Sequence, residues 1–371
     1  MSQKKLLGKL YARHIIWLIT LSFLIGTLFL VAYYKVHPIF LSAPLVMLFL
    51  VTIDSFQSKH SVRRNYPLVG RLRYLFESVR PEFRQYFFEG ELDGKPFNRR
   101  QRSIVYQRAK NQKQTISFGM QDEPNRIGYE WAAHSIYPKK NDFSQFRVTI
   151  GNSQCSKPYS ASIFNISAMS YGALSKTAIS SLNEGAKMGN FAHNTGEGGI
   201  SDYHLKGGDL IWQIGTGYFG CRDGKGHFND ALFVEKANLK EVKMIEIKLS
   251  QGAKPGHGGL LPAEKNTPEI ARIRALEPHK TVHSPSAHTA FSNATELLYF
   301  IQKLRNLSNG KPVGFKICIG KKEEFTEIIE AMLNTNILPD FITIDGAEGG
   351  TGAAPLEFID YMGMALSDAL V

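Results

Sequence analysis

Cysteine is scarce in this sequence, and its scarcity argues against some classes of cofactor. The 371 residues include three cysteines, Cys155, Cys221 and Cys318, which form no CxxC pair or closely spaced group. Iron–sulfur clusters take several thiolates that are usually close in sequence, so an iron–sulfur cluster is not supported within this chain and we expect buried thiols.

Charge is absent from two apolar runs near the N-terminus. Residues 15–34 carry no charged side chain, and at about 1.5 Å per residue a helix of this length crosses a bilayer core of roughly 30 Å. Residues 39–53 form a second uncharged run, which is shorter and contains Pro44. A cleaved signal peptide is the alternative for the first run, but its apolar core is longer than signal peptides usually have. We therefore predict a transmembrane helical hairpin within residues 1–54.

Basic residues flank the predicted hairpin on both sides. Residues 1–14 carry four Lys and Arg and no acidic residue, and residues 54–113 carry fourteen Lys and Arg against six Asp and Glu. This distribution follows the positive-inside rule and predicts a membrane protein whose remaining chain lies on the cytoplasmic side. Aromatic residues interleave with the basic ones in residues 55–113, and beside a membrane segment this composition favours membrane lipid, not nucleic acid, as the partner.

Residues 244–265 have the composition of a binding loop. MIEIK at 244–248 indicates a buried strand, and a glycine-rich segment that contains Lys254 follows Lys248. Glycines let backbone amides approach a ligand where a Cβ would collide. A mobile surface loop with solvated lysines is the alternative explanation.

The same succession of a short apolar strand and a glycine-rich loop recurs along the chain. The candidate strands lie near 162–168, 190–194, 210–215, 243–248, 313–319 and 341–345. Helical segments separate several of them, and Ser175 is placed to cap the first of these helices. Strands that alternate with helices, and whose polar loops follow the strand ends, predict an α/β fold, a TIM (β/α)8-type barrel with about six of its eight strands present. A doubly wound sheet is the alternative architecture.

Several motifs, in this order and spacing, resemble the flavin-binding synthase domain of glutamate synthase. They are MSYGALS at 169–175, NTGEGG at 194–199, IK at 247–248, QGAKPG at 251–256, PEIARIR at 268–274 and GGTGA at 349–353. Within that family the chain is similar to the membrane-anchored, stand-alone proteins. The resemblance implies an FMN barrel over residues 160–371, in which 2-iminoglutarate, formed from 2-oxoglutarate and ammonia, takes a hydride from reduced flavin to give L-glutamate.

The resemblance also implies which residues bind the cofactor. Lys248 would stabilise the negative charge of reduced flavin without donating a proton. A buried structural lysine is the alternative for this residue, although lysine is rarely buried without a partner or a role. The other cofactor contacts implied are Met169, Ser170, Gln213, Gly349 and Gly350.

For the substrate, the resemblance implies three further residues. Glu197 would hold ammonia or move a proton during imine formation, so that Glu197 and Lys248 are the implied catalytic pair. Lys254 and Arg274 would bind the two carboxylates. An acid in a turn is the alternative for Glu197, and a solvated helix face is the alternative for Arg274.

Two positions depart from the family pattern and leave the substrate open. Leu260 stands where the family commonly has glutamine, and His257 where it commonly has glutamate. Losing an amide that faces the substrate lowers the hydrogen-bonding capacity of the pocket, so another 2-oxo or 2-hydroxy acid is an alternative substrate. A non-catalytic membrane scaffold that keeps the barrel is the alternative outside the enzymes.

The resemblance assigns parts of the reaction to other molecules. The last two strands of the family barrel, where such barrels form a phosphate site, are missing by residue 371, so we expect an incomplete barrel that by itself binds FMN weakly or not at all. No glutaminase portion precedes the predicted hairpin, so ammonia is expected from solution or from a separate protein, and electrons from a separate donor. Residues 55–113 are predicted to be a basic juxtamembrane segment, and residues 114–159 a connecting region.

Overall fold

The computed structural model of the protein shows two compact units. The residues that it describes are 12–112, 115, 119–120, 122–140, 142, 146–252, 258–349 and 354–371. The chain divides into the units Met1–Ala133 and His134–Val371. The boundary between them falls within the predicted connecting region, residues 114–159.

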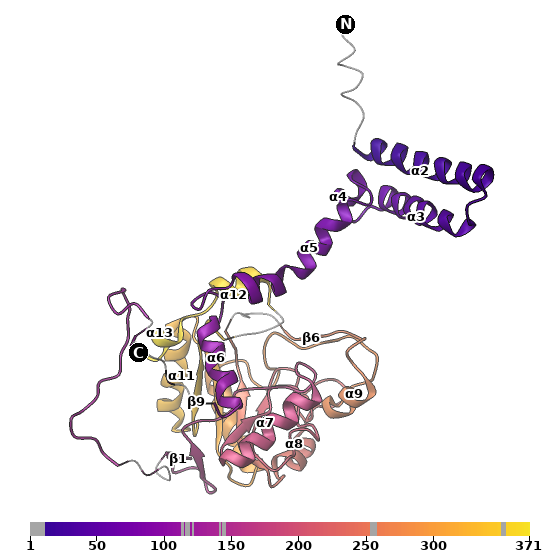
Figure 1. The fold of residues 1–371 in the computed structure, drawn as a ribbon. Helices are drawn as coiled ribbons and strands as arrows, with labels where there is room; N and C mark the ends of the chain where they lie inside the picture. Colours follow the sequence, from indigo (N-terminus) through magenta and orange to yellow (C-terminus); the bar gives the residue numbers. More distant parts are fainter. Residues whose placement is uncertain are drawn as a thin grey trace. The chain divides into compact units, whose positions relative to one another are not determined.

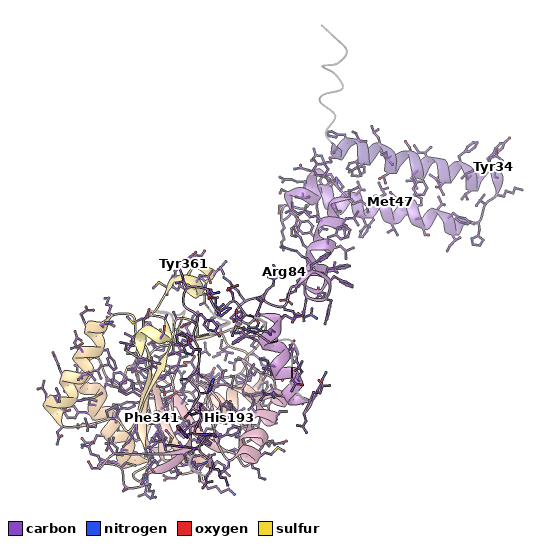
Figure 2. The ribbon with its side chains drawn as sticks, turned by 60° about the vertical axis from the view of Figure 1, so that its left-hand side comes forward. Tyr34, Met47, Arg84, His193, Phe341 and Tyr361 are labelled. Atoms are coloured by element: carbon purple, nitrogen blue, oxygen red, sulfur yellow. The ribbon has the colours of Figure 1, made fainter. Side chains whose placement is uncertain are left out.

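The first unit begins with a helical hairpin, in which α2 (Ala12–Tyr34) and α3 (Ser42–Phe56) run side by side (Figure 1). The short helix η1 (Pro38–Leu41) joins them. Both Ala12–Tyr34 and Pro38–Phe56 are long and apolar enough to cross a membrane, with mean hydropathies of 2.5 and 2.1. Figure 2 shows their side chains projecting outward along both helices, on which Tyr34 and Met47 are labelled.

A buried carboxylate connects the hairpin to the helices that follow it. Asp54 near the end of α3 is fully buried and lies 2.6 Å from Arg63 Nη2 and 2.7 Å from Arg71 Nε. Arg63 belongs to α4 (Ser61–Asn65) and Arg71 to α5 (Gly70–Phe83). Because a buried charge is tolerated only when it is paired, these contacts hold both helices against the end of α3.

Helices also make up most of the predicted basic juxtamembrane segment. After α5 come η2 (Arg84–Phe88) and α6 (Arg99–Ala109). A capping box begins α6, because the Asn98 side chain accepts from the Gln101 N–H while the Gln101 side chain accepts from the Asn98 N–H. Local sequence therefore specifies where this helix starts.

The second unit is built on a parallel sheet of five strands. In chain order they are β3 (Ala192–Asn194), β4 (Asp209–Ile214), β5 (Val242–Lys248), β8 (Val313–Cys318) and β9 (Ile342–Asp345). They are hydrogen-bonded in that same order, and every pair is parallel. Two small antiparallel pairs lie outside the sheet, β1 (Arg147–Ile150) with β2 (Tyr159–Ser162), and β6 (Leu260–Leu261) with β7 (Val282–His283).

Helices follow or connect the parallel strands. They are α7 (Lys176–Gly189), α8 (Asp230–Ala237), α9 (Pro268–Arg274), α10 (Ala294–Leu307), α11 (Lys322–Thr335), α12 (Leu356–Tyr361) and α13 (Leu366–Ala369). The prediction for the first of them is confirmed, since the Ser175 side chain accepts a hydrogen bond from the Ala178 N–H. That helix ends at Asn190, which takes the left-handed conformation with φ 52°.

The strand order supports the predicted architecture at a coarser level. A doubly wound sheet reverses its strand order at a switch point, whereas here the order follows the chain, so the curled five-stranded sheet is consistent with a TIM-type domain. Of the strand predicted at 162–168, the structure has only Ser162, at the end of β2, and a parallel bridge at Ile166. Ile166 makes a single bridge to His193, and the Asn165 side chain donates to the Ser162 carbonyl and accepts from the Ala192 N–H. The side chain thus occupies backbone groups that a regular ladder would use.

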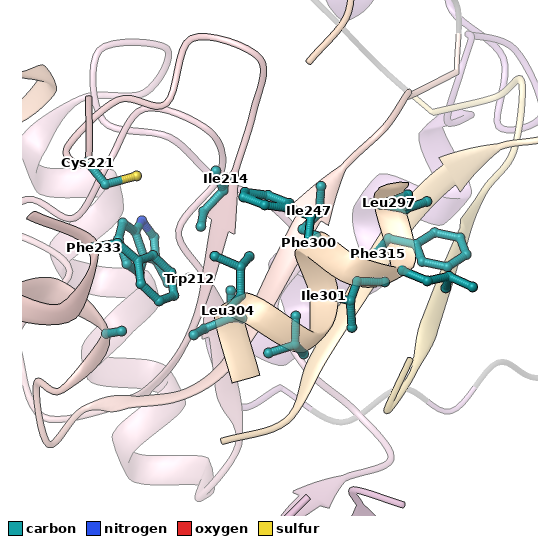
Figure 3. Packing of buried hydrophobic residues seen from close by; sticks show 14 of the residues in the cluster. Trp212, Ile214, Cys221, Phe233, Ile247, Leu297, Phe300, Ile301, Leu304 and Phe315 are labelled. Atoms are coloured by element: carbon teal, nitrogen blue, oxygen red, sulfur yellow. The ribbon is translucent and has the colours of Figure 1, made fainter. Parts of the chain in front are cut away.

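The main hydrophobic core lies between the sheet and α10. Ile301 and Leu304 of α10 pack against Trp212, Ile247 and Phe315 of the strands, and all five are fully buried (Figure 3). Successive side chains of a strand point to opposite faces. The residues that alternate with these strand residues therefore face the interior of the curled sheet.

Candidate active site

A cavity of about 370 Å³ lies at the C-terminal ends of the parallel strands. The residues that line it are Ser167, Ala168, Met169, Ser170, Gly196, Glu197, Gln213, Lys248, Gln251, Lys316, Asp345 and Gly349. Its volume falls within the roughly 300–1,000 Å³ of small-molecule and cofactor sites. TIM-type barrels place their active sites at this end of the strands, so we take this cavity as the candidate active site.

Two predicted residues form an ion pair at the cavity. Lys248 is the last residue of β5, and its Nζ lies 3.0 Å from Oε1 of Glu197, in the loop after β3. The lysine side chain is 12% exposed and the carboxylate 37%, so both remain open to the cavity. A Cβ at Gly215 would lie 2.8 Å from the Glu197 Cβ, so the glycine leaves room for this side chain at the end of β4.

A second ion pair lines the same cavity, and the sequence analysis missed it. Lys316 Nζ lies 3.0 Å from Asp345 Oδ2, with exposures of 12% and 18%. Asp345 also accepts a hydrogen bond from the Gly252 N–H, and a Cβ at Gly349 would lie 2.4 Å from Asp345 Oδ1. A charged residue in the C-terminal half of an otherwise apolar strand was the signal that could have found both residues.

A buried carboxylate, Glu246, accepts hydrogen bonds from side chains at and behind the wall of the cavity. Glu246 is 1% exposed, and its Oε1 accepts from Asn194 Nδ2 at 2.8 Å and from Gln213 Nε2 at 2.7 Å. Its Oε2 accepts from Thr343 Oγ1 at 2.6 Å. Gln213, which was predicted to contact the cofactor, therefore lines the cavity with one amide donor already engaged. Because Glu246 faces three donors at once, it holds the Gln213 side chain in one orientation.

The loop at Met169 and Ser170 forms another part of the wall. The Met169 N–H donates to the Asn194 carbonyl at 3.1 Å, and its carbonyl lies 3.0 Å from His204 Nε2. Burial lowers the pKa of His204, and its contact with the Met169 carbonyl acts in the opposite direction. Met169 thus lies at the cavity as predicted, but both of its backbone polar groups are engaged. The Ser170 hydroxyl has no hydrogen-bond partner within the described residues, so it is the better placed of the two to contact a ligand.

Arg274 lies near Glu197 but outside the lining of the cavity. It is the last residue of α9, its Nη2 donates to the Tyr171 carbonyl at 3.2 Å, and its guanidinium carbon lies 5.0 Å from the centre of the Phe219 ring. Burial lowers the pKa of Arg274, whereas the charge of Glu197 raises it. Arg274 Nε is buried without a partner among the described residues. The guanidinium therefore has an unused donor near the Glu197 carboxylate.

Some of the predicted site lies outside the described residues. Lys254 and Gly350 do, and so does His257, one of the two departures from the family pattern. The other departure, Leu260, is 59% exposed on β6 and is not among the residues that line the cavity. The expectation that an amide is lost from the pocket at Leu260 therefore finds no support in the described cavity.

The three cysteines are all free thiols. Cys221 is buried, whereas Cys155 and Cys318 are half-buried, and burial raises the pKa of each thiol. Within the part of the chain that the structure describes, no group of three or more His, Cys, Asp and Glu side chains is placed to hold a metal ion. A raised pKa keeps these thiols protonated at neutral pH, which makes them poor nucleophiles.

Comparison with known proteins shows the family. A family model described as a conserved region in glutamate synthase matches residues 103–371. The chain belongs to the glutamate synthase family. The matched region contains every residue of the cavity, including the two lysine–carboxylate pairs.

Three relatives within this family show how far the similarity extends. A Bacillus subtilis protein named glutamate synthase large subunit-like protein YerD is 36% identical over 373 residues, 89% of this chain and 70% of that protein. The archaeal glutamate synthase (NADPH) of Methanocaldococcus jannaschii is 31% identical over 251 residues, 67% of this chain and 45% of that protein. The ferredoxin-dependent glutamate synthase of Cyanidium caldarium is 32% identical over 235 residues, 54% of this chain and 14% of that protein. The chain thus spans less than half the length of the latter two relatives.

Proposed function

We propose that the chain is the catalytic barrel of an FMN-dependent oxidoreductase that reduces 2-iminoglutarate, formed from 2-oxoglutarate and ammonia, to L-glutamate. The observation that carries the proposal is the meeting of two lysine–carboxylate pairs, Lys248 with Glu197 and Lys316 with Asp345, at one cavity in a glutamate synthase family member. The ammonium groups supply positive charge for an anionic cofactor and substrate. The carboxylates can hold ammonia and move a proton.

The donor chemistry of the cavity fits the flavin ring of FMN. Lys248 and Lys316 present ammonium groups, Ser170 presents a hydroxyl and Gln213 presents an amide, all at one wall. A Cβ at Gly196 would lie 2.8 Å from the Ser170 nitrogen, so the two loops approach as closely as a glycine permits. Bound here, FMN would supply the hydride for the reaction.

Within this proposal Glu197 handles ammonia and protons. Its pairing with Lys248 orients the carboxylate, and its exposure of 37% leaves it accessible to a small molecule in the cavity. A carboxylate in this position can accept a proton from ammonium while the nitrogen adds to the carbonyl carbon of the 2-oxo acid. The same group can return that proton as water leaves to form the imine.

Two cations are proposed to bind the substrate carboxylates. Arg274 keeps an unpaired, buried Nε among the described residues, and guanidinium groups suit bidentate contact with a carboxylate. Lys254 is the second proposed cation, from the loop that follows Lys248. Two cations set apart select a dicarboxylate over a monocarboxylate, which favours 2-oxoglutarate over other 2-oxo acids.

Electrons and ammonia are proposed to come from other molecules. The names of two relatives specify NADPH and ferredoxin for those proteins. The GxGxxG run of this chain, GTGYFG at 215–220, follows β4 but does not open a helix as a dinucleotide-binding fingerprint does, because the next helix, α8, begins at Asp230. We therefore propose a separate electron-donor protein, and ammonia from solution or from a separate ammonia-supplying protein.

The N-terminal hairpin is proposed to anchor the enzyme in a membrane, with the barrel on the cytoplasmic side. The most apolar stretches of its two helices are only 11% and 22% buried, whereas a core helix of a soluble protein is mostly buried. Basic residues on both flanks support the orientation. The test is labelling by a membrane-impermeant maleimide. Cysteine introduced at His37 should react from the outside and cysteine at Lys59 should not, and the reverse result would contradict the topology.

The reaction is tested with the full gene product reconstituted with FMN. The flavin is reduced with dithionite without oxygen and mixed with 2-oxoglutarate and ammonium, while flavin absorbance and L-glutamate are followed. We expect reoxidation that needs both compounds and yields one glutamate per flavin. If other 2-oxo acids reoxidised the flavin and 2-oxoglutarate did not, the proposed substrate would be contradicted. If the folded protein failed to bind FMN, the proposed cofactor would be contradicted.

A further inference from the structure

A second polar cavity lies at the opposite end of the sheet from the candidate active site. Its volume is about 610 Å³, and it forms where the starts of β4 and β5 meet β1 and β2. We call it the basic groove, and the residues that line it are Arg147, Lys157, Pro158, Tyr159, Ser160, Asp209, Asn238, Leu239, Lys240, Val242, Lys243 and Lys311. Lys243 and Lys248 are five residues apart on β5, so roughly 16 Å separates the groove from the first ion pair of the active site.

The basic groove is positively charged, although the part of the chain that contains it has a slight excess of acidic residues. Residues 114–371 carry 25 Lys and Arg against 27 Asp and Glu, a slight excess of acid. The lining of the groove nevertheless contains five Lys and Arg and one carboxylate, Asp209. A cleft lined by one sign of charge focuses the electrostatic potential and raises the local concentration of ligands of the opposite sign.

Two of these cations, Arg147 and Lys311, are held in place by neutral groups. Arg147 donates to the Asn190 carbonyl at 2.7 Å, and Lys311 donates to the carbonyls of Ala237 and Leu239 at 2.5 and 3.1 Å. Carbonyls orient a cation but do not neutralise it. Within the described residues, no carboxylate lies within ion-pair distance of Arg147, Lys157 or Lys311.

Two other lysines of the groove do contact acids, but only loosely. Lys243 Nζ lies 3.6 Å from Asp209 Oδ1, and Lys240 Nζ lies 3.6 Å from Glu241 Oε1. The Asp209 carboxylate also accepts a hydrogen bond from the Tyr159 hydroxyl at 2.8 Å. Two acids, Asp209 and Glu241, set against five Lys and Arg therefore leave the groove with a net positive charge.

The pKa of Lys311 reflects both its burial and the neighbouring positive charge of the groove. Burial, together with repulsion from Lys243 and Lys157, lowers the pKa of Lys311 to about 8, and Glu241 opposes the shift. An anion placed among these lysines would reverse the repulsion and raise that pKa. Binding near pH 8 would therefore take up a proton.

We propose that the basic groove is a binding site for a phosphate-bearing ligand, which is either a soluble phosphate ester or diphosphate or the headgroup of an anionic phospholipid. Several ammonium groups and one guanidinium in a cavity of this size match the multiple oxygens and multiple charges of a phosphate group. The proposal is independent of the chemistry proposed for the active site, because the two cavities share no residue.

The test uses the full gene product in nanodiscs of phosphatidylcholine, titrated with inorganic pyrophosphate by calorimetry. We expect one site that weakens with added salt and takes up protons near pH 8, measured as a heat that depends on the ionisation enthalpy of the buffer. The double variant Lys157→Gln/Lys243→Gln should weaken binding by about tenfold or more, because two charge-assisted contacts are lost. The control Lys280→Gln/Lys321→Gln removes the same charge at exposed positions outside the groove and should bind as the wild type.

A second arm distinguishes the two sources of the phosphate. Nanodiscs that contain phosphatidylglycerol should compete with pyrophosphate if the groove takes lipid headgroups, and should leave pyrophosphate binding unchanged if the ligand is soluble. Either result supports a phosphate site. The absence of pyrophosphate binding, or equal binding by the wild type and the groove variant, would overturn the proposal. Circular dichroism of both double variants checks that each is folded.

Discussion

The two ends of the parallel sheet use similar ion pairs for different purposes. At the C-terminal ends of the strands, Lys248 is 12% exposed and its partner Glu197 is 37% exposed, beside a cavity. At the other end, Arg305 Nη2 lies 3.0 Å from Asp340 Oδ2, and these side chains are 4% and 0% exposed. Asp340 also accepts from the Val313 N–H at 2.8 Å. Pairs that remain open can exchange partners with a ligand, whereas a sealed pair can only hold the fold together.

The sealed pair gives the largest expected effect on stability. Asp340→Ala leaves the Arg305 guanidinium buried without its carboxylate, so the free energy of unfolding should fall by about 3–5 kcal/mol. Chemical denaturation followed by tryptophan fluorescence measures the change. Glu235→Ala is the matched control, because it breaks an exposed pair with Lys236 and should change stability by about 1 kcal/mol or less. If Asp340→Ala and Glu235→Ala lowered the free energy of unfolding equally, burial of the Arg305–Asp340 pair would not matter for stability.

The open pair should affect the reaction and leave the fold largely unchanged. Lys248→Met removes the cation at the cavity, and the rate of flavin reoxidation should fall by about 10²–10³. Glu197 stays hydrated at 37% exposure, so unfolding should shift far less than in Asp340→Ala. Lys303→Met, on the exposed side of α10, is the control for loss of a lysine. A strong loss of stability with little change in rate would assign Lys248 to the fold.

Buried imidazoles, not the ion pairs at either end, should dominate the loss of stability in mild acid. Burial lowers the pKa of His193 from 6.5 to about 4, and both ring nitrogens lack partners among the described residues. As pH falls from about 6.5 to about 4, the unfolded chain takes up a proton that the folded chain does not, so stability falls. The loss reaches about 3 kcal/mol, at about 1.4 kcal/mol per pH unit.

His193→Phe tests this pH dependence. Denaturation curves at pH 7 and pH 4.5 should differ less in this variant than in the wild type, because one titrating group has been removed. His283→Phe, at an exposed position on β7, should keep the wild-type difference. If the stability of His193→Phe differed between pH 7 and pH 4.5 as much as that of the wild type, groups other than His193 would cause the loss of stability in acid.

The smallest effect is expected from the carboxylate beneath the cavity. Glu246→Gln replaces a charged acceptor by a neutral amide, which weakens the hydrogen bonds from Asn194 and Gln213 and requires the Thr343 hydroxyl to turn and accept, at about 1–3 kcal/mol. Because Gln213 then loses its fixed orientation, FMN should also bind more weakly, which a titration of flavin fluorescence measures. Thr343→Val removes one donor only and should have a smaller effect on both quantities. If Glu246→Gln changed stability but not FMN affinity, Gln213 would have no role in the cofactor site.

Local features of the fold were predictable from sequence, whereas pairings across the sheet were not. The cap at Ser175 was correct because the side chain bonds a backbone group three residues away. The motifs around Glu197 and Lys248 indicated a common site, and the two residues do meet. Lys316 and Asp345 went unnoticed because their contact depends on the register of β8 against β9. The strand predicted at 162–168 is reduced to Ser162 and a bridge at Ile166, because the Asn165 side chain bonds backbone groups that a ladder needs.

By itself, the sequence determined the α/β class and the positions of most strands and helices, because periodicity, capping residues and glycine spacing act over a few residues. Its motifs resembled those of the family to which the chain belongs. Only the tertiary structure decided which charges face the cavity and which are sealed. Asn194 and Glu246 lie 52 positions apart in the chain and meet through strand register. The alternation of side chains then directs Glu246 and Lys248 inward and Ile247 into the core. Strand register therefore decides whether a charged side chain lines the cavity or forms a buried ion pair that stabilises the fold.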